Sequence, residues 1–161
     1  TVAKIAVQTS ATAEFFQRYQ GRIRINTAVL SKAASRGNLI AQQTPNTGPM
    51  TFTHTQAADE LSGKFRNLFY VPENGELAEG SRLLLTLGAT YDRDGNFSTT
   101  DDQAEVIYPV ELSGDGAGRF LRNGYYRVQA LIDGLTGSEI SVSISVADWE
   151  APVTQSVNLG Q

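Results

Sequence analysis

The clearest pattern along the chain is a strict alternation of apolar and hydroxyl side chains over residues 140–146. This period of two is typical of a β-strand with one buried face and one solvated face. A second extended stretch follows at 153–159. The side chains that fall together on one side of that stretch are Val153, Gln155, Val157 and Leu159. A half-buried strand needs a neighbouring strand, which can belong to the same molecule or to another.

Similar extended patterns recur upstream, separated by turn residues, and Pro109 predicts an edge strand or bulge within one of them. A short helical turn is expected at 12–19, with Thr12 as its N-cap. Between 52 and 70 the pattern is ambiguous, because 57–69 suits a helical turn that Gly63 interrupts. The strands expected from the remaining patterns are 1–10, 22–29, 82–91, 105–112, 125–132 and 140–146.

About seven strands with little helix predict an all-β protein, an antiparallel β-sandwich. The length of 161 residues and the 40% apolar content suit one domain, residues 1–161, with a substantial core. We expect residues 150–161 to form a terminal strand of this domain or of a neighbour. Because the chain starts at Thr1 rather than Met, we expect it to be a processed piece.

Composition excludes several classes of function. The net charge of −4 leaves no broad basic field for nucleic acid. The absence of cysteine excludes disulfides, thiolate zinc sites and cysteine nucleophiles. No apolar run approaches the roughly 20 residues of a membrane helix.

No motif predicts catalysis, a cofactor or a metal. His54 is the only histidine, and nothing nearby supplies a catalytic partner or a set of ligands, so we interpret it as a loop residue. Residues 114–118 contain three alternating glycines, but Arg119 stands where a dinucleotide fingerprint needs its third glycine. We interpret this segment as a flexible connection between strands and expect no enzymatic activity.

One acidic segment keeps an alternative open. Asp92, Asp94 and Asn96 alternate as at the start of an EF-hand calcium loop, and two more aspartates, Asp101 and Asp102, follow. Phe97 stands where that loop requires glycine, and Gln103 where it requires glutamate. We interpret 92–96 as a polar hairpin turn, with calcium binding as the alternative.

Aromatic side chains allow a second alternative, a sugar-binding platform. We expect them to lie in the core of the sandwich instead, with Trp149 closing its end. The candidates for such a platform are Phe65, Phe69, Tyr70, Tyr125 and Tyr126.

Five local motifs, in this order, resemble the C-terminal half of fimbrillins, the shaft and accessory subunits of type V pili. Together these motifs span nearly the whole chain. They are Val2-Ala-Lys4-Ile5-Ala-Val7, Phe69-Tyr70-Val71-Pro72-Glu73-Asn74, Ile107-Tyr108-Pro109-Val110, Leu121-Arg122-Asn123-Gly124-Tyr125-Tyr126 and Val146-Ala147-Asp148-Trp149. We expect Arg122 and Asn123 to shape the start of the strand at 125–132.

The resemblance implies a transthyretin-like β-sandwich, made as a lipoprotein precursor and polymerised into fimbriae at the outer membrane. In that family, removal of the first strand opens a groove in one subunit, and a terminal strand of the next subunit fills it. The N-terminal domain, the lipobox cysteine and the cleaved first strand of the family are not recognisable in this sequence. The resemblance therefore implies other fimbrial subunits as partners, and host or bacterial surface molecules as ligands. Contact with the membrane is expected only through a lipid anchor, which is absent from this chain.

These expectations define two functions that differ in class. The first is a structural or accessory subunit of cell-surface fimbriae, assembled by strand exchange and supporting adhesion, with Val153, Gln155, Val157 and Leu159 as the donor side. The second is a β-sandwich module that binds glycans or host proteins. Whether 153–159 pairs within its own sandwich or in another subunit stays open.

Overall fold

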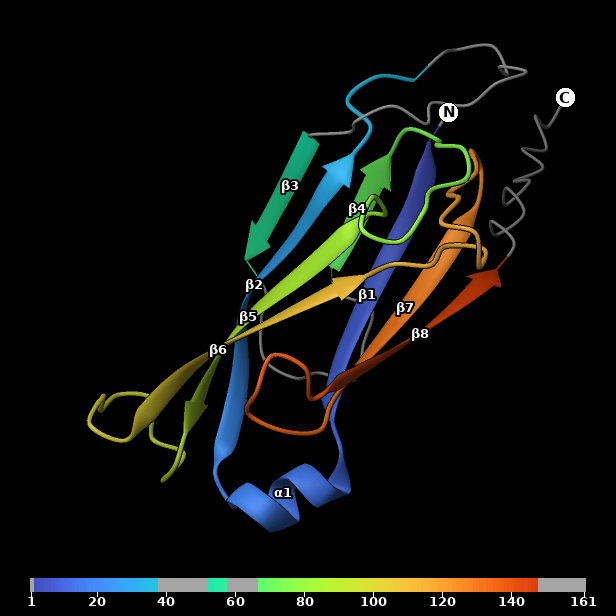
Figure 1. Ribbon diagram of the computed structural model, residues 1–161. Helices are drawn as coiled ribbons and strands as arrows, with labels where there is room; N and C mark the ends of the chain where they lie inside the picture. The colour runs from blue at the N-terminus through green and yellow to red at the C-terminus, as the bar shows by residue number, and fades with distance from the viewer. Residues whose placement is uncertain (1, 38–51, 58–66, 148–161) are drawn as a thin grey trace, which may run out of the picture.

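The computed structural model describes residues 2–37, 52–57 and 67–147, which form two β-sheets packed face to face (Figure 1). The elements of the first sheet are, in spatial order, β4 (Asn67–Val71), β1 (Ala3–Ala11), β7 (Tyr125–Ile132) and β8 (Ile140–Ala147). Those of the second are β3 (Phe52–Ala57), β2 (Arg22–Ala33), β5 (Leu84–Asp92) and β6 (Gln103–Glu111). The predicted β-sandwich is confirmed.

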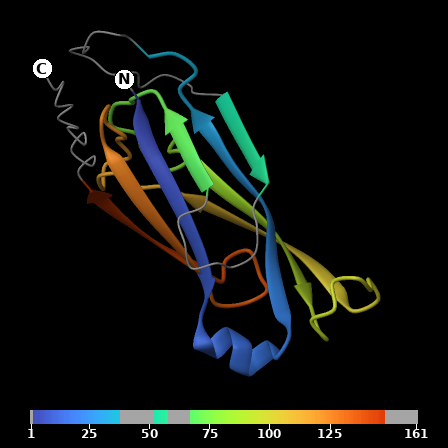
Figure 2. The same cartoon turned by 180° about the vertical axis from the view of Figure 1, so that it is seen from behind.

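One pair of strands differs from the expected antiparallel arrangement. β1 runs parallel to β7, with Lys4 opposite Tyr125 and Ala11 opposite Ile132, whereas the other described pairs are antiparallel. The polypeptide leaves β1 for the other sheet, so no hairpin turn forces β7 to run in the opposite direction. Seen from behind, β4 lies beside β1, and β3 beside β2 (Figure 2).

A single short helix, α1 (Ala13–Tyr19), connects β1 to β2 and so carries the chain between the sheets. Thr12 caps it as predicted, because its hydroxyl oxygen accepts a hydrogen bond from the Phe15 N–H at 3.0 Å. The Phe15 ring is fully buried and meets the Tyr91 ring edge-on. The helix therefore closes one end of the sandwich. None of the described helices is long and apolar enough to cross a bilayer.

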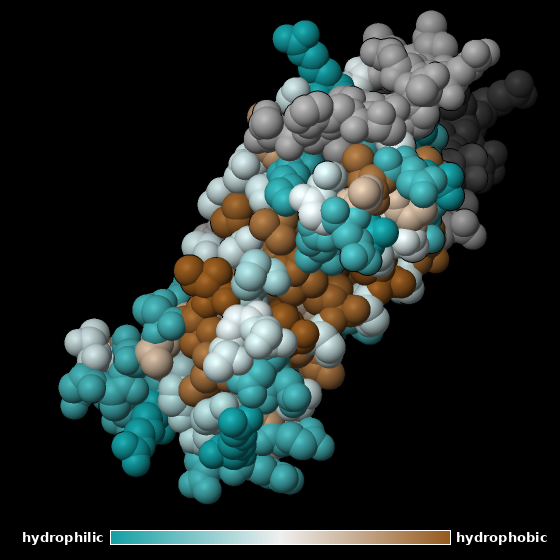
Figure 3. All heavy atoms as spheres, in the orientation of Figure 1, coloured by the Kyte–Doolittle hydropathy of each residue, from teal (hydrophilic) through white to brown (hydrophobic). Residues whose placement is uncertain are grey.

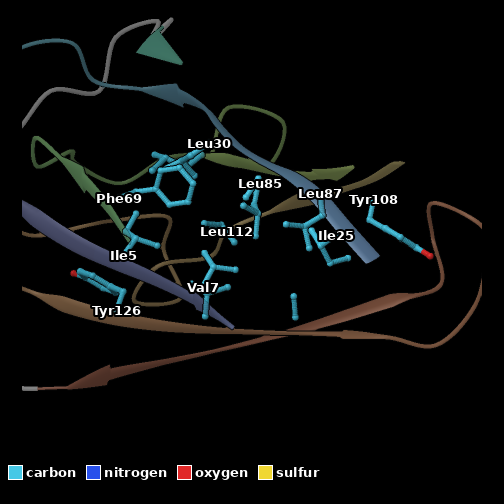
Figure 4. Close-up of a cluster of buried hydrophobic side chains, with 14 of the residues drawn as sticks. Ile5, Val7, Ile25, Leu30, Phe69, Leu85, Leu87, Tyr108, Leu112 and Tyr126 are labelled. Atoms are coloured by element: carbon cyan, nitrogen blue, oxygen red, sulfur yellow. The ribbon is translucent and has the colours of Figure 1, made fainter. Parts of the chain in front are cut away.

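The core consists of side chains that alternate inward from both sheets (Figure 4). In β7, the inward side chains are buried while the residues between them are exposed or half-buried. Each fully buried Leu, Ile, Val or Phe side chain contributes about 1.5–3 kcal/mol relative to an exposed one. The largest members include Ile5, Phe69, Leu85, Leu87, Tyr108 and Tyr126.

The ambiguous region between 52 and 70 forms strands rather than a helical turn where the structure describes it. β3 pairs with β2, and β4 pairs with β1, where Phe69 is opposite Ile5. Phe69 is 1% exposed and Tyr70 48%, which is strand alternation. The helical turn that the pattern allowed at 57–69 is therefore wrong for residues 67–69, which belong to β4, and residues 58–66 lie outside the described residues.

Candidate functional site

β8 is one of the two edge strands of the first sheet, and no described strand pairs with its outer side. β8 pairs with β7 alone among the described strands, with Val128 opposite Ile144. Its eight residues contain no charged side chain and no proline. Proteins ordinarily protect such an edge with lysine, proline or a bulge, because its free N–H and C=O groups can pair with another chain. The edge of β8 is therefore suited to accept a further strand.

The edge of the other sheet that lies near β8 is protected. β6 pairs with β5, placing Pro109 opposite Thr86, and Pro109 has no N–H to offer to another strand. This confirms that Pro109 marks an edge strand. Glu105 and Glu111 add negative charge to the same strand. The two edges therefore differ in their capacity to pair.

Between the two edges lies a band of incompletely buried apolar side chains, here called the β6–β8 seam. Figure 3 shows hydrophobic side chains gathered in a band along this side of the molecule. In β7 the inward residues are at most 2% exposed. In β8, Ile140, Val142 and Ile144 are only half-buried against the core, and Val146 is 59% exposed. The seam thus retains apolar area that a further strand could bury. Its residues are Val110, Leu135, Ile140, Val142 and Ile144.

The sheets are joined across one end of the seam. The Tyr108 hydroxyl donates a hydrogen bond to the Gly134 carbonyl at 2.7 Å, connecting β6 with the loop that precedes β8. Burial, followed by the charges of Glu139 and Tyr19, raises the pKa of Tyr108 to about 12. The hydroxyl therefore stays protonated and keeps donating throughout the neutral range.

The predicted donor residues Val153, Gln155, Val157 and Leu159 lie outside the described residues, as does Trp149. Their role stays a prediction. What the structure adds is the position of the strand immediately before them, since β8 ends at Ala147.

Two of the sequence motifs meet at one end of the sandwich. The Arg122 Nε donates to Glu73 Oε1 at 2.8 Å, and both side chains are mostly buried. The Arg122 hydrogen bond outweighs desolvation and lowers the pKa of Glu73. Asn123 adopts a left-handed conformation, and its N–H donates to the Val2 carbonyl. The structural role expected for Arg122 and Asn123 is confirmed.

The glycine-rich segment 114–118 connects β6 to β7 as expected, and four of its N–H groups already have partners within the loop. The Asp115 carboxylate accepts hydrogen bonds from the Ala117 and Arg119 N–H groups at 3.1 and 3.3 Å. It also forms an ion pair with the Arg119 side chain at 2.7 Å. The segment therefore closes on itself and presents no cradle for a phosphate.

His54 lies on β3 rather than in a loop, and its Nε2 has no hydrogen-bond partner among the described residues. Its ring packs edge-on against Phe52, with ring centres 4.6 Å apart. Desolvation lowers its pKa, which favours the neutral form. The expectation of a loop residue was wrong, because pairing with β2 draws this segment into the sheet: Leu30 is opposite His54.

The aromatic residues give little support to a sugar platform. Phe69 and Tyr126 are buried in the core, as predicted, whereas Tyr70 is 48% exposed, so the expectation of a core position was wrong for Tyr70. Phe65 lies outside the described residues. Tyr125 is covered by Lys4, whose Nζ lies 4.4 Å from the ring centre. A shallow depression on the outer face of the first sheet contains no aromatic side chain; it is lined by Gln8, Ser10, Gln129, Leu131, Ser141, Val142 and Ser143.

The acidic segment forms a carboxylate cluster at the β5–β6 connection. Asp92, Asp94 and Asp102 each place an oxygen within 4.8 Å of the others. The Asn96 hydrogen bond lowers the pKa of Asp94, but the neighbouring Asp92 carboxyl, desolvation and the Asp102 charge outweigh it, so that the pKa is raised. The expected polar turn is thus also a site where negative charge converges.

Comparison with known proteins adds information on the fold. No protein-family model matches the sequence, and no curated protein matches it significantly. A solved structure of a "putative cell adhesion protein" from Parabacteroides distasonis matches with 14% identity and a TM-score of 0.61, covering 96% of this chain and 53% of that one. A second protein of the same description, from Bacteroides eggerthii, matches with 16% identity and a TM-score of 0.57, covering 92% and 56%.

A fimbrilin from Porphyromonas gingivalis also matches, with 17% identity, a TM-score of 0.48, and coverage of 92% of this chain and 58% of that one. The chain spans little more than half the length of each of these structures. The protein therefore has the fold found in the two cell adhesion proteins, over about half of their length.

Proposed function

We propose that this protein is a structural or accessory subunit of cell-surface fimbriae, which assembles by β-strand addition and takes no part in catalysis. The observation that carries the proposal is the unprotected edge of β8, together with the half-buried apolar side chains of the β6–β8 seam. The five fimbrillin-like motifs and the likeness to two cell adhesion folds support it.

The strand that adds to the seam is, in this proposal, segment 153–159 of a neighbouring subunit. It has seven residues, no charged side chain and no proline, and β8 has eight residues of the same neutral character. Strand addition joins the backbones by hydrogen bonds and lets alternate side chains fill apolar positions. Val153, Val157 and Leu159 would supply these side chains.

As in the family that the motifs resemble, the proposed location is the cell surface, with export as a lipoprotein precursor to the outer membrane. Adhesion to host or bacterial ligands belongs to the assembled fimbria in this proposal. Other fimbrial subunits are the direct partners.

The absence of cysteine makes a clean cross-linking test available. Ser143→Cys is placed on β8 and Ser156→Cys in the donor segment, in separate and in combined variants of the 161-residue chain. Two differently tagged preparations are mixed and treated with a short thiol-specific cross-linker. We expect products that join both tags through positions 143 and 156. Ser98→Cys, in the exposed β5–β6 connection, is the matched control for position 143.

The products distinguish the alternatives. Cross-links found only within one chain would assign 153–159 to its own sandwich and remove the donor role. Absence of any 143–156 cross-link would contradict strand addition at β8. A fibre assay adds an independent readout: Val157→Asp should prevent polymerisation, whereas Ser156→Asp, on the opposite side of the strand, should be tolerated.

A further inference from the structure

The carboxylate cluster at the β5–β6 connection lies apart from the β6–β8 seam, at the end of the sandwich that carries α1 (Figure 1). Asp92 is the last residue of β5, and Asp102 directly precedes the first residue of β6. The turn of the chain brings them together with Asp94, and one oxygen from each lies within 4.8 Å of the other two.

Each carboxylate is oriented through one of its two oxygens. The Gln103 Nε2 donates to Asp92 Oδ2 at 3.0 Å. The Asn96 N–H donates to Asp94 Oδ1 at 2.7 Å, and the Asp94 N–H donates to Asp102 Oδ2 at 3.0 Å. The positions of all three carboxylates are therefore set by the connection itself.

The second oxygen of two of these carboxylates has no partner. Asp92 is 0% exposed, and its Oδ1 accepts no hydrogen bond. The Oδ1 of Asp102 is likewise buried and unpartnered. No described lysine or arginine forms an ion pair with any of the three groups. Burying a carboxylate oxygen without a partner is costly, and a cation beside the Oδ1 atoms of Asp92 and Asp102 would offset that cost.

We propose that Asp92, Asp94 and Asp102 bind a calcium ion. Calcium prefers oxygen ligands at 2.3–2.6 Å, so two ligands on opposite sides of one ion are separated by about 4.6–5.2 Å, and adjacent ligands by less. The separation of at most 4.8 Å among the three oxygens fits a single shared ion. Magnesium requires shorter bonds and stricter octahedral geometry, for which an acidic loop is less suited.

The structure also accounts for the two departures from the EF-hand pattern. Gln103, which replaces the usual glutamate, orients Asp92, and Asp102 supplies the carboxylate one position earlier. Phe97, which replaces the usual glycine, packs under the Arg24 guanidinium, whose carbon lies 4.6 Å from the ring centre. Neither substitution therefore removes a ligand from the cluster. The bound ion would hold the ends of β5 and β6 together.

Calcium titration of the full protein tests the proposal. After treatment with a chelator and its removal, calorimetry with calcium chloride should give one site with a dissociation constant of about 10⁻⁴–10⁻³ M, the range of extracellular modules. Calcium should also raise the midpoint of thermal unfolding, relative to sodium chloride at the same ionic strength. Magnesium chloride is titrated in parallel and should bind more weakly.

Two variants that remove one negative charge each provide the comparison. Asp94→Asn should weaken calcium binding by about tenfold or more, because ligand charge governs affinity in such sites. Asp94 is exposed, so this variant avoids the core disruption expected for Asp92. Asp101→Asn is the matched control: Asp101 is exposed and lies outside the cluster, and calcium affinity should be unchanged.

Three results would overturn the assignment. They are the absence of calcium binding by the unsubstituted protein, equal calcium affinities of the Asp94→Asn and Asp101→Asn variants, and magnesium binding as tight as that of calcium. None of them bears on strand addition at β8, which involves other residues.

Discussion

Arg122 Nε donates a hydrogen bond to Glu73 Oε1 at 2.8 Å and so joins two segments that are 49 positions apart in the chain. The side chains are 14% and 11% exposed. The neighbouring Asn74 strengthens the same junction, since its Nδ2 donates to the Gly118 carbonyl at 2.7 Å. The turn after β4 is thereby held against the connection that leads into β7.

Glu73→Gln should destabilise the protein, because it leaves a mostly buried arginine without its counter-charge. We expect the midpoint of thermal unfolding to fall by about 5 °C. Differential scanning calorimetry measures the change. Glu79→Gln, at an exposed position, removes the same charge and should have little effect. Equal midpoints for the two variants would show that the ion pair contributes nothing specific.

The contribution of Glu73 should also depend on pH. Its pKa is lowered in the folded protein, chiefly by the hydrogen bond from Arg122. A lowered folded pKa means that the stabilisation is present above the ordinary carboxyl pKa and is lost as the pH falls through the folded pKa. The difference in unfolding free energy between the unsubstituted protein and Glu73→Gln should therefore be full at neutral pH and shrink on acidification. A difference that grows with acid would contradict this assignment.

Tyr108→Phe removes the hydrogen bond that joins the sheets at one end of the β6–β8 seam. The buried Gly134 carbonyl then loses its donor, which should cost about 1–3 kcal/mol of unfolding free energy. Denaturant unfolding measures this loss, which should be constant throughout the neutral range because the hydroxyl stays protonated. Tyr70→Phe, at an exposed position, is the control and should be nearly neutral.

Thr12→Ala should destabilise α1, because the Phe15 N–H loses its acceptor. The expected cost is about 1 kcal/mol. The Thr12 hydroxyl also donates to Asp133 Oδ1 at 2.8 Å, so the loop between β7 and β8 loses a contact as well. Thr12→Ser keeps the hydroxyl and should retain most of the stability in chemical denaturation. If serine is no better than alanine, the capping interpretation fails.

The fold class and most strands could be predicted because their alternation is local. In β7, inward Tyr126 and Val128 alternate with outward Arg127 and Gln129, and the structure follows this pattern. β3 and β4 could not be predicted in the same way. The segment around Phe69 has apolar spacings that suit either a helix or a strand, and pairing with β1 decided between them.

The carboxylate cluster, too, could be predicted only in part from the sequence. The sequence alone shows that Asp92, Asp94 and Asn96 alternate as in a calcium loop, and it shows that Phe97 and Gln103 depart from that loop. It does not show which later carboxylate joins them. The return of the chain into β6 places Asp102 beside Asp92. It also brings the Gln103 side chain close enough to donate a hydrogen bond to Asp92 Oδ2.

The sequence by itself determined which side chains share a face of each strand, since a period of two is a property of the extended backbone. Only the tertiary structure decided which strands are neighbours, because backbone hydrogen bonds carry no side-chain signature. β7 and β8 show the same alternation, yet β7 lies between two strands and its inward row is buried. β8 lies at an edge, where no described strand pairs with its other side, and its inward row is not fully buried.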